Sequence, residues 1–137
     1  MKVSTEVELE SEQLAAFLAA QVQEKKARDV RILDLRGRVA YTDLLVLCTA
    51  RSARQAKAIA DGVRRAAKSE LQQLPRSVEG QTSGRWVLVD FSDVVLHVFE
   101  ESMRGFYDLD GIWSDVPTLP IPDIEPAEDE GALLLLP

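Results

Sequence analysis

The chain has 137 residues, of which 46% are hydrophobic and 28% charged, and its formal net charge at pH 7 is -7. This length and composition fit one globular domain with its own core. The polar N-terminus lacks the apolar segment of a signal peptide, no run reaches the roughly 18 apolar residues of a membrane span, and the single cysteine suits a reducing compartment, so we expect a cytoplasmic protein with no membrane partner.

The negative charge is concentrated at the C-terminal end. Residues 121–137 contain five acidic residues and no lysine or arginine, so the remaining chain is nearly balanced. We predict a flexible N-terminus over residues 1–10, a folded domain over 11–116, and an acidic, proline-containing, disordered tail over 117–137. Because no strong basic stripe is present, we expect little or no binding to naked nucleic acid.

The first half of the chain predicts one helix followed by two strands. A helix starting near residue 11, with Ser11 as its N-cap, would place four apolar residues on one face: Leu14, Phe17, Leu18 and Val22. Two strands follow, "VRILDL" and "LLVLCT". The second strand is apolar on both faces, which indicates a central position in the sheet.

A long second helix is predicted between the cap candidate Ser52 and Pro75. Its apolar stripe should face the core with Ile59, Val63, Ala66, Ala67, Leu71 and Leu74. Its outer face has four basic residues: Arg54, Lys57, Arg64 and Lys68. We interpret these as an ordinary solvated face and keep a binding role as the less favoured alternative.

The segments "RWVLVD" and "VVLHVF" alternate in polarity and are close enough to form a β-hairpin. A turn centred on residues 91–92 would pair Trp86 with His97 and Asp90 with Asp93, all on one face of the sheet. The stretch "ESMRGFYDLDGIW" then predicts a short last helix. The order of elements predicts a single α/β domain with a mixed sheet and helices packed on it.

Candidate catalytic groups are few. A catalytic Cys48–His97 pair is disfavoured, since Cys48 lies in an apolar strand where nothing activates its thiol. One histidine and one cysteine are too few ligands for a structural zinc site. Asp90 and Asp93, near the Ser83-Gly84 turn, could hold Mg²⁺ as in a nucleotidyltransferase, although three-residue spacing across a turn is unfavourable geometry. His97 itself fits either a packed histidine or a recognition face. We expect no cofactor and no metal.

A series of short motifs extends through the domain in a fixed order. It consists of Asp34 and Gly37, Thr42-Asp43, Thr49 with Ser52 and Arg54, Val78-Glu79-Gly80, Trp86 with Asp90, Asp93 with His97, and finally Arg104, Tyr107, Leu109 and Trp113. Together these resemble the ribosomal silencing factor family, also called Iojap or DUF143, over roughly residues 12 to 114. The chain departs from the family pattern at Ser92, where glycine is common, and at Gly105, where a charged residue is commoner.

The resemblance implies a fold similar to nucleotidyltransferases and a factor that is not an enzyme. Such a factor binds the large ribosomal subunit through its fourteenth numbered protein, at the subunit interface, and blocks joining of the small subunit. The corresponding partner-binding residues would be Trp86, Asp90, Asp93, His97, Arg104 and Tyr107. A homodimer away from the ribosome is left open, and a divergent metal-dependent nucleotidyltransferase is the alternative function.

Overall fold

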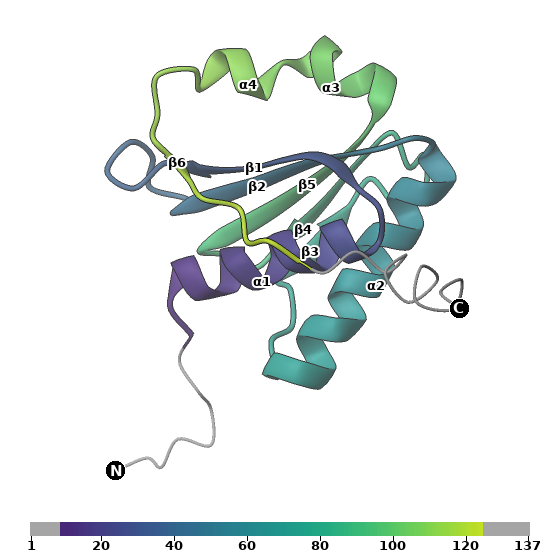
Figure 1. The fold of residues 1–137 in the computed structure, drawn as a ribbon, viewed down its shortest axis with the longest axis horizontal. Coiled ribbons are helices and arrows are strands. Elements are labelled where there is room, and N and C mark those ends of the chain that lie inside the picture. The colour runs from purple at the N-terminus through teal and green to yellow at the C-terminus, as the bar shows by residue number, and fades with distance from the viewer. Residues whose placement is uncertain (1–8, 125–137) are drawn as a thin grey trace, which may run out of the picture.

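The computed structural model describes residues 9–124, which form a six-stranded sheet between two layers of helices (Figure 1). Helices α1 and α2 cover one face, and the shorter α3 and α4 lie over the other. In chain order the elements are α1 (Ser11–Glu24), β1 (Arg28–Asp34), β2 (Leu44–Ala50), α2 (Ala53–Leu71), β3 (Ser77–Glu79), β4 (Trp86–Asp90), β5 (Val94–Glu100), α3 (Glu101–Tyr107), α4 (Leu109–Ile112) and β6 (Thr118–Leu119).

The prediction of a single α/β domain with a mixed sheet is confirmed. The strand order is β3-β4-β5-β2-β1-β6, in which β2 and β5 are parallel and the other neighbours antiparallel. Two short strands, β3 and β6, were not predicted, because three residues or fewer are too few for a hydrophobic period to be recognised. The single last helix predicted from "ESMRGFYDLDGIW" is divided into α3 and α4 at Asp108, which has a left-handed conformation.

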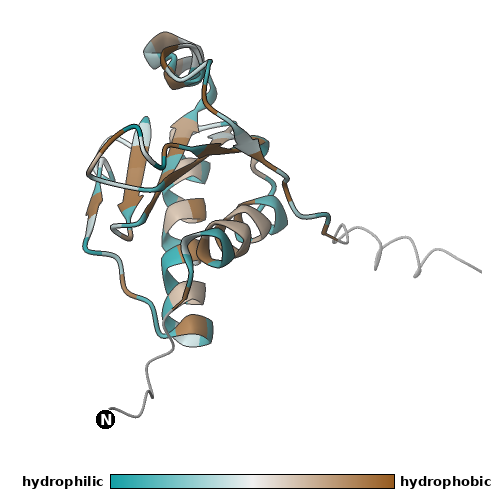
Figure 2. Cartoon of the chain, turned by 90° about the vertical axis from the view of Figure 1, so that its left-hand side faces the viewer, coloured by the Kyte–Doolittle hydropathy of each residue, from teal (hydrophilic) through white to brown (hydrophobic). Residues whose placement is uncertain are grey.

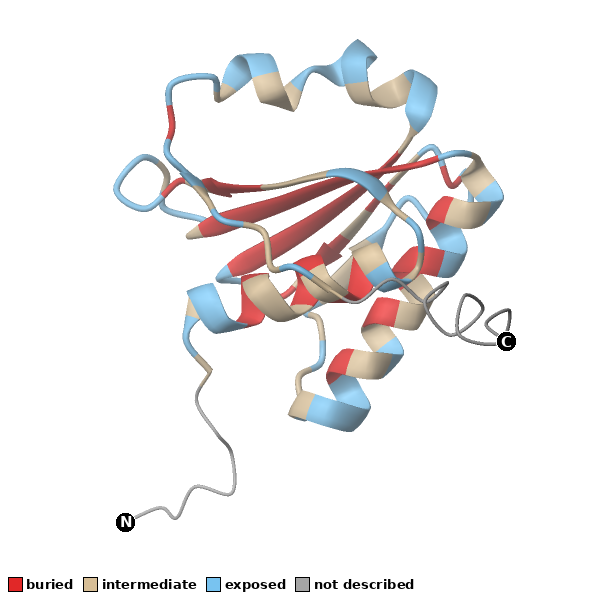
Figure 3. Cartoon of the chain, viewed as in Figure 1, coloured by how far each residue is buried: buried red, intermediate tan, exposed pale blue. Residues whose placement is uncertain are grey.

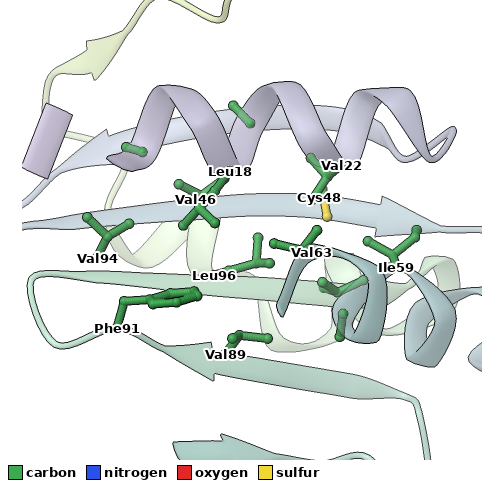
Figure 4. Packing of buried hydrophobic residues seen from close by; sticks show 14 of the residues in the cluster. Leu18, Val22, Val46, Cys48, Ile59, Val63, Val89, Phe91, Val94 and Leu96 are labelled. Atoms are coloured by element: carbon green, nitrogen blue, oxygen red, sulfur yellow. The ribbon is translucent and has the colours of Figure 1, made fainter. Parts of the chain in front are cut away.

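Strand β2 is the centre of the sheet, as its sequence predicted, and all seven of its residues are buried. Alternate side chains of β2 point to opposite layers, because successive residues of a strand face opposite sides. Val46 and Cys48 pack toward α1 and α2, where Leu18 and Val63 meet them (Figure 4). The central strands β2 and β5 are accordingly the most buried of the sheet, whereas β3 and β6 contain no buried residue (Figure 3). The strands of the sheet are largely apolar (Figure 2).

The predicted helix ends are partly confirmed. Ser52 caps α2 by accepting a hydrogen bond from the backbone N–H of Gln55 at 3.0 Å. Ser11 is not the cap of α1, because Glu10 occupies that position in a reciprocal capping box with Gln13. The prediction that Leu74 faces the core is also wrong: α2 ends at Leu71, and Leu74 is 66% exposed.

The β4–β5 hairpin forms, but its predicted register is wrong by two residues. Trp86 lies opposite Phe99, and Leu88 lies opposite His97. The two residues flanking the turn, Phe91 and Val94, are both buried in the α1–α2 layer, and their burial fixes the turn at positions 92 and 93. Because the shift is even, the side chains predicted to share one face of the strands still do so.

The predicted start of the tail at residue 117 is contradicted for its first eight residues. Strand β6 pairs with β1, and the carbonyl oxygen of Pro122 accepts a hydrogen bond from the Gln23 side chain at 3.0 Å. Ile121 packs against the core beside α1. The folded domain therefore extends to residue 124 at least, whereas residues 1–8 and 125–137 lie outside the described chain, together with most of both predicted flexible ends.

Across residues 9–124, no helix is both long and apolar enough to cross a membrane.

Candidate functional site

The layer formed by α3 and α4 leaves large apolar side chains exposed. All residues of these two helices are half-buried or exposed, in contrast to the buried bands of α1 and α2 (Figure 3). Three of their large apolar side chains face solvent: Phe106 is 73% exposed, Ile112 62% and Tyr107 41%. Contiguous exposed apolar surface is typical of a site where another macromolecule binds.

Two of these side chains, Phe106 and Tyr107, belong to an aromatic cluster with Trp86, His97 and Phe99. The Trp86 ring is stacked on Phe99 with centroids 5.0 Å apart, and it lies 4.4 Å from the ring of Tyr107. Phe106 meets Tyr107 edge to face at 5.0 Å. The cluster thus extends from the buried Phe99 through Trp86 to the solvent, which gives the exposed rings a rigid support.

His97 holds Trp86 from the neighbouring strand. The indole Nε1–H of Trp86 donates a hydrogen bond to Nδ1 of His97 at 3.0 Å. The contact is diagonal across the ladder, because Leu88 rather than Trp86 lies directly opposite His97. His97 is only 7% exposed, so its role in this structure is to orient the tryptophan from below.

Burial decides the charge state of His97. Loss of hydration lowers its pKa to about 4, although the negative charge of Asp90 acts in the opposite direction. At neutral pH the ring is therefore uncharged, and Nδ1 keeps the lone pair that accepts the hydrogen bond from the indole N–H of Trp86. Of the two interpretations of His97 left open by the sequence, the structure supports the packed histidine.

Arg104 fixes α3 and α4 to the sheet. Its side chain is 13% exposed and donates two hydrogen bonds to Asp110, at 2.8 and 3.1 Å. It also donates to the backbone oxygen of Asp29 and to the hydroxyl of Thr49, both at 2.8 Å. Hydrogen bonds from Arg104, with a further one from Arg31, lower the pKa of Asp110 to about 2. Arg104 therefore positions the aromatic helices from within the domain.

The two candidate carboxylates lie apart from the aromatic cluster, at the hairpin turn. Asp90 accepts a hydrogen bond from the backbone N–H of Ser92 and forms an ion pair with Arg76 at 3.1 Å. Asp93 is exposed and lines an open polar depression with Glu12 and Arg36, among others. Asp93 does not lie opposite Asp90, because Asp90 pairs with Val95.

The sheet also separates Cys48 from His97. In the parallel β2–β5 ladder Leu47 lies beside His97 and Cys48 beside Val98, so the two side chains point to opposite faces. Burial raises the pKa of the Cys48 thiol to about 12, which keeps it protonated. Among residues 9–124 the structure contains no group of three or more His, Cys, Asp or Glu side chains that could hold a metal ion.

Of the six residues predicted to bind a partner, the structure therefore brings together Trp86, His97 and Tyr107, places Arg104 beneath the helices, and leaves Asp90 and Asp93 at the turn. The sequence reasoning missed the most exposed ring, Phe106, and its buried support, Phe99. No sequence signal indicated Phe106, because an apolar residue in a short amphipathic helix usually faces inward. How α3 packs on the sheet decides that the Phe106 side chain faces solvent.

A comparison with protein families identifies the relatives of this chain. The family model described as "Ribosomal silencing factor during starvation" matches residues 8–132. The chain belongs to the ribosomal silencing factor family. The family consists of regulatory, ribosome-associated factors that repress translation, and the match covers all of the described residues.

Individual relatives agree with this assignment. The ribosomal silencing factor of Halalkalibacterium halodurans is 33% identical over 111 residues, covering 81% of this chain and 94% of the relative. That of Bacillus subtilis is 37% identical over 99 residues, covering 72% and 83%. Crystal structures of proteins from Bacillus halodurans and Chromobacterium violaceum superpose with TM-scores of 0.70 and 0.74 at 32% and 28% identity. They cover 80% and 88% of this chain, and 99% and 98% of their own.

Proposed function

We propose that this protein binds the large ribosomal subunit through its fourteenth numbered protein and blocks joining of the small subunit. The observation that supports a docking role is the aromatic cluster, whose outer rings are exposed on a rigid base. Aromatic residues with a buried support are frequent energetic anchors of protein interfaces. The family assignment supports the ribosome as the partner of this surface.

Such a factor needs no chemical step. A folded domain of about 116 described residues occupies a volume that a second body cannot share, so binding at the subunit interface excludes a partner that uses the same surface. The repression would follow from occupancy alone. We therefore propose that the protein is not an enzyme and that it acts in the cytoplasm, where its ribosomes are.

The alternative of a metal-dependent nucleotidyltransferase has less support from the geometry. It requires acidic side chains that converge on one metal ion. Asp90 is already engaged by Arg76, and Asp93 belongs to a different surface at the turn. The two functions differ in a direct measurement, since an enzyme of this class must bind Mg²⁺ and a nucleotide, and calorimetry with both detects this.

The docking proposal is tested by sedimentation with purified large and small subunits. Wild-type protein should sediment with large subunits only. Trp86→Ala should lose at least about 2 kcal/mol of binding free energy, roughly a 30-fold increase in Kd. Because Trp86 also packs inside the domain, Phe106→Ala provides a second variant in which only an exposed ring is truncated.

Leu74→Ala is the matched control, because Leu74 is a similarly exposed apolar residue that follows the end of α2, away from the aromatic cluster. It should bind like wild type. Full binding by folded Trp86→Ala and Phe106→Ala would show that the aromatic cluster is not the docking surface. Sedimentation of the protein alone would also reveal a homodimer, and the isolated fourteenth protein tests the named partner directly.

A further inference from the structure

Most arginines of the described chain are neutralised within the domain. Eight of the eleven arginines in residues 9–124 form ion pairs with carboxylates, among them Arg28, Arg36 and Arg104. The three exceptions in this range are Arg51, Arg54 and Arg85, all of them exposed. The guanidinium groups of these three residues therefore stay available to an anion outside the domain.

The three arginines gather at one edge of the sheet, where β2 and β5 end and α2 and β4 begin. Arg51 directly follows Ala50, which lies beside Glu100 in the parallel ladder. The backbone oxygen of Arg85 accepts a hydrogen bond from the N–H of Glu100 at 2.9 Å. Neighbouring strands are about 4.8 Å apart, so the backbones at positions 85 and 51 are separated by about 10 Å across β5.

A close approach between two segments adds a fourth basic residue to this edge. Gly84 packs so tightly on the first turn of α2 that a Cβ there would lie 2.6 Å from the carbonyl oxygen of Ala53 and 2.8 Å from Cε of Lys57. The exposed Lys57 is therefore adjacent to Arg85 and one turn from Arg54. We call these four residues, Arg51, Arg54, Lys57 and Arg85, the basic edge.

The basic edge adjoins the aromatic cluster. Arg85 immediately precedes Trp86, and α3, which contains Phe106 and Tyr107, begins directly after Glu100. One carboxylate is close by: Glu100 interacts electrostatically with Arg85, and its oxygens accept hydrogen bonds from Ser102 at 2.5 and 3.0 Å. Because the four basic side chains outnumber this one carboxylate, the basic edge keeps a net positive charge at the edge of the sheet from which Trp86 and α3 start.

We propose that the basic edge contacts ribosomal RNA phosphates while the aromatic cluster binds the ribosomal protein. This inference rests on the proposed function. Exposed guanidinium groups without a carboxylate partner are suited to phosphate, which they bind through paired hydrogen bonds. RNA phosphates are the dominant negative charges of a ribosomal subunit. Four charges are too few to hold naked RNA tightly at physiological salt, so the contact adds to a complex that the aromatic rings already position.

The test compares two triple variants with the same change of net charge. Arg51→Gln, Arg54→Gln and Arg85→Gln neutralise the three arginines of the basic edge and leave Lys57. Arg64→Gln, Arg65→Gln and Lys68→Gln neutralise three bases farther along the same helix and form the control. The Kd for purified large subunits is measured from 50 to 200 mM salt, and thermal unfolding verifies that both variants are folded.

Each phosphate contact contributes about 0.7 to 0.9 to the slope of log K against log salt. The basic-edge variant should therefore have a slope shallower by about 2 to 3, and its loss of affinity relative to wild type should be about 20- to 40-fold larger at 50 mM than at 200 mM salt. The control should have the wild-type slope. A basic-edge variant with the slope and Kd of wild type or of the control would overturn the proposal.

A second measurement distinguishes RNA from protein as the occupant. The basic-edge variant should bind the isolated ribosomal protein as tightly as wild type, because that ligand has no phosphates. An equal loss on the isolated protein and on the subunit would mean that the arginines contact an acidic protein surface, which contradicts the proposal. If the proposed function itself were wrong, the result would be distinguishable, since wild-type protein would then not bind large subunits at any salt concentration.

Discussion

The two faces of the sheet differ in how completely the helices that cover them are buried. On one face the long helices α1 and α2 enclose a continuous apolar core that includes Leu18, Val46 and Val63 (Figure 4). On the other face the short α3 and α4 cover a smaller cluster and leave Phe106 and Ile112 in solvent. Stability is therefore concentrated in the closed face, and the open face keeps apolar surface available for a partner.

The largest expected effect is a loss of stability on the closed face. Leu18→Ala removes a side chain with no solvent exposure, where α1 packs on β2, and should destabilise the protein by about 2–5 kcal/mol. Denaturant unfolding measures this. The fraction that remains folded should bind large subunits normally, and a folded variant with impaired binding would mean that the two faces are not independent.

On the face covered by α3 and α4, the expected effect is a pH-dependent stability that comes from the buried His97. The pKa of His97 is about 4 when folded and about 6.5 when unfolded, so below pH 6.5 the unfolded chain takes up a proton that the folded protein excludes. The stability contributed by the neutral ring is complete above pH 6.5 and is lost as the pH falls to 4, about 3 kcal/mol in all.

Unfolding of wild type and His97→Gln at pH 7.5 and 4 measures this contribution. The loss between these pH values should be about 3 kcal/mol smaller in the variant. The lowered pKa of Asp110, about 2, acts at lower pH and is common to both proteins. Equal losses in wild type and variant would show that His97 is not buried in its neutral form.

Removal of Arg104 should weaken the attachment of α3 and α4 to the sheet. Arg104→Ala leaves Asp110 with one partner and Thr49 without its donor, at a cost of about 2 kcal/mol. Hydrogen exchange should show loss of protection in α3 and α4 while α1 and α2 stay protected. Arg31→Ala is the control, because Arg31 binds the same carboxylate from a more exposed position and should cost less than about 1 kcal/mol.

Phe106→Ala should separate stability from docking most clearly. Phe106 is 73% exposed, so its truncation should change the free energy of unfolding by less than about 0.5 kcal/mol. Binding to large subunits should weaken about 10-fold or more if the ring is an interface anchor. Unchanged binding together with unchanged stability would exclude Phe106 from the interface.

Deletion of residues 125–137 should have the smallest effect. The deleted segment contains four acidic residues, whose charges would repel RNA phosphates rather than bind them. Binding to large subunits and the block of subunit joining should be undiminished. A cut at residue 121 is a different experiment, since it removes Ile121 and Pro122 from their contacts with the domain. Loss of either activity in the shorter deletion would show that the tail takes part.

Sequence reasoning was most successful where a local pattern determines the structure. The apolar run of β2 indicated a central strand, and Ser52 indicated the start of α2, because burial on both faces and helix capping depend on neighbouring residues. It was wrong about Leu74 because the pattern of an amphipathic helix does not show where the helix ends. The left-handed conformation of Gln72 ends it one turn earlier.

The candidate site was predicted only in part for the same physical reason. Motif order in the sequence placed Trp86, His97 and Tyr107 in one family pattern, and alternation put Trp86 and His97 on one face of the hairpin. The sequence could not supply the register, because Phe91 and Val94 set it by packing against helices far away in the chain. Nor could it show that Arg104 is used internally or that Arg51, Arg54 and Arg85 meet at one edge. Ion pairing and proximity depend on which distant segments the sheet brings together, and only the tertiary structure decides that.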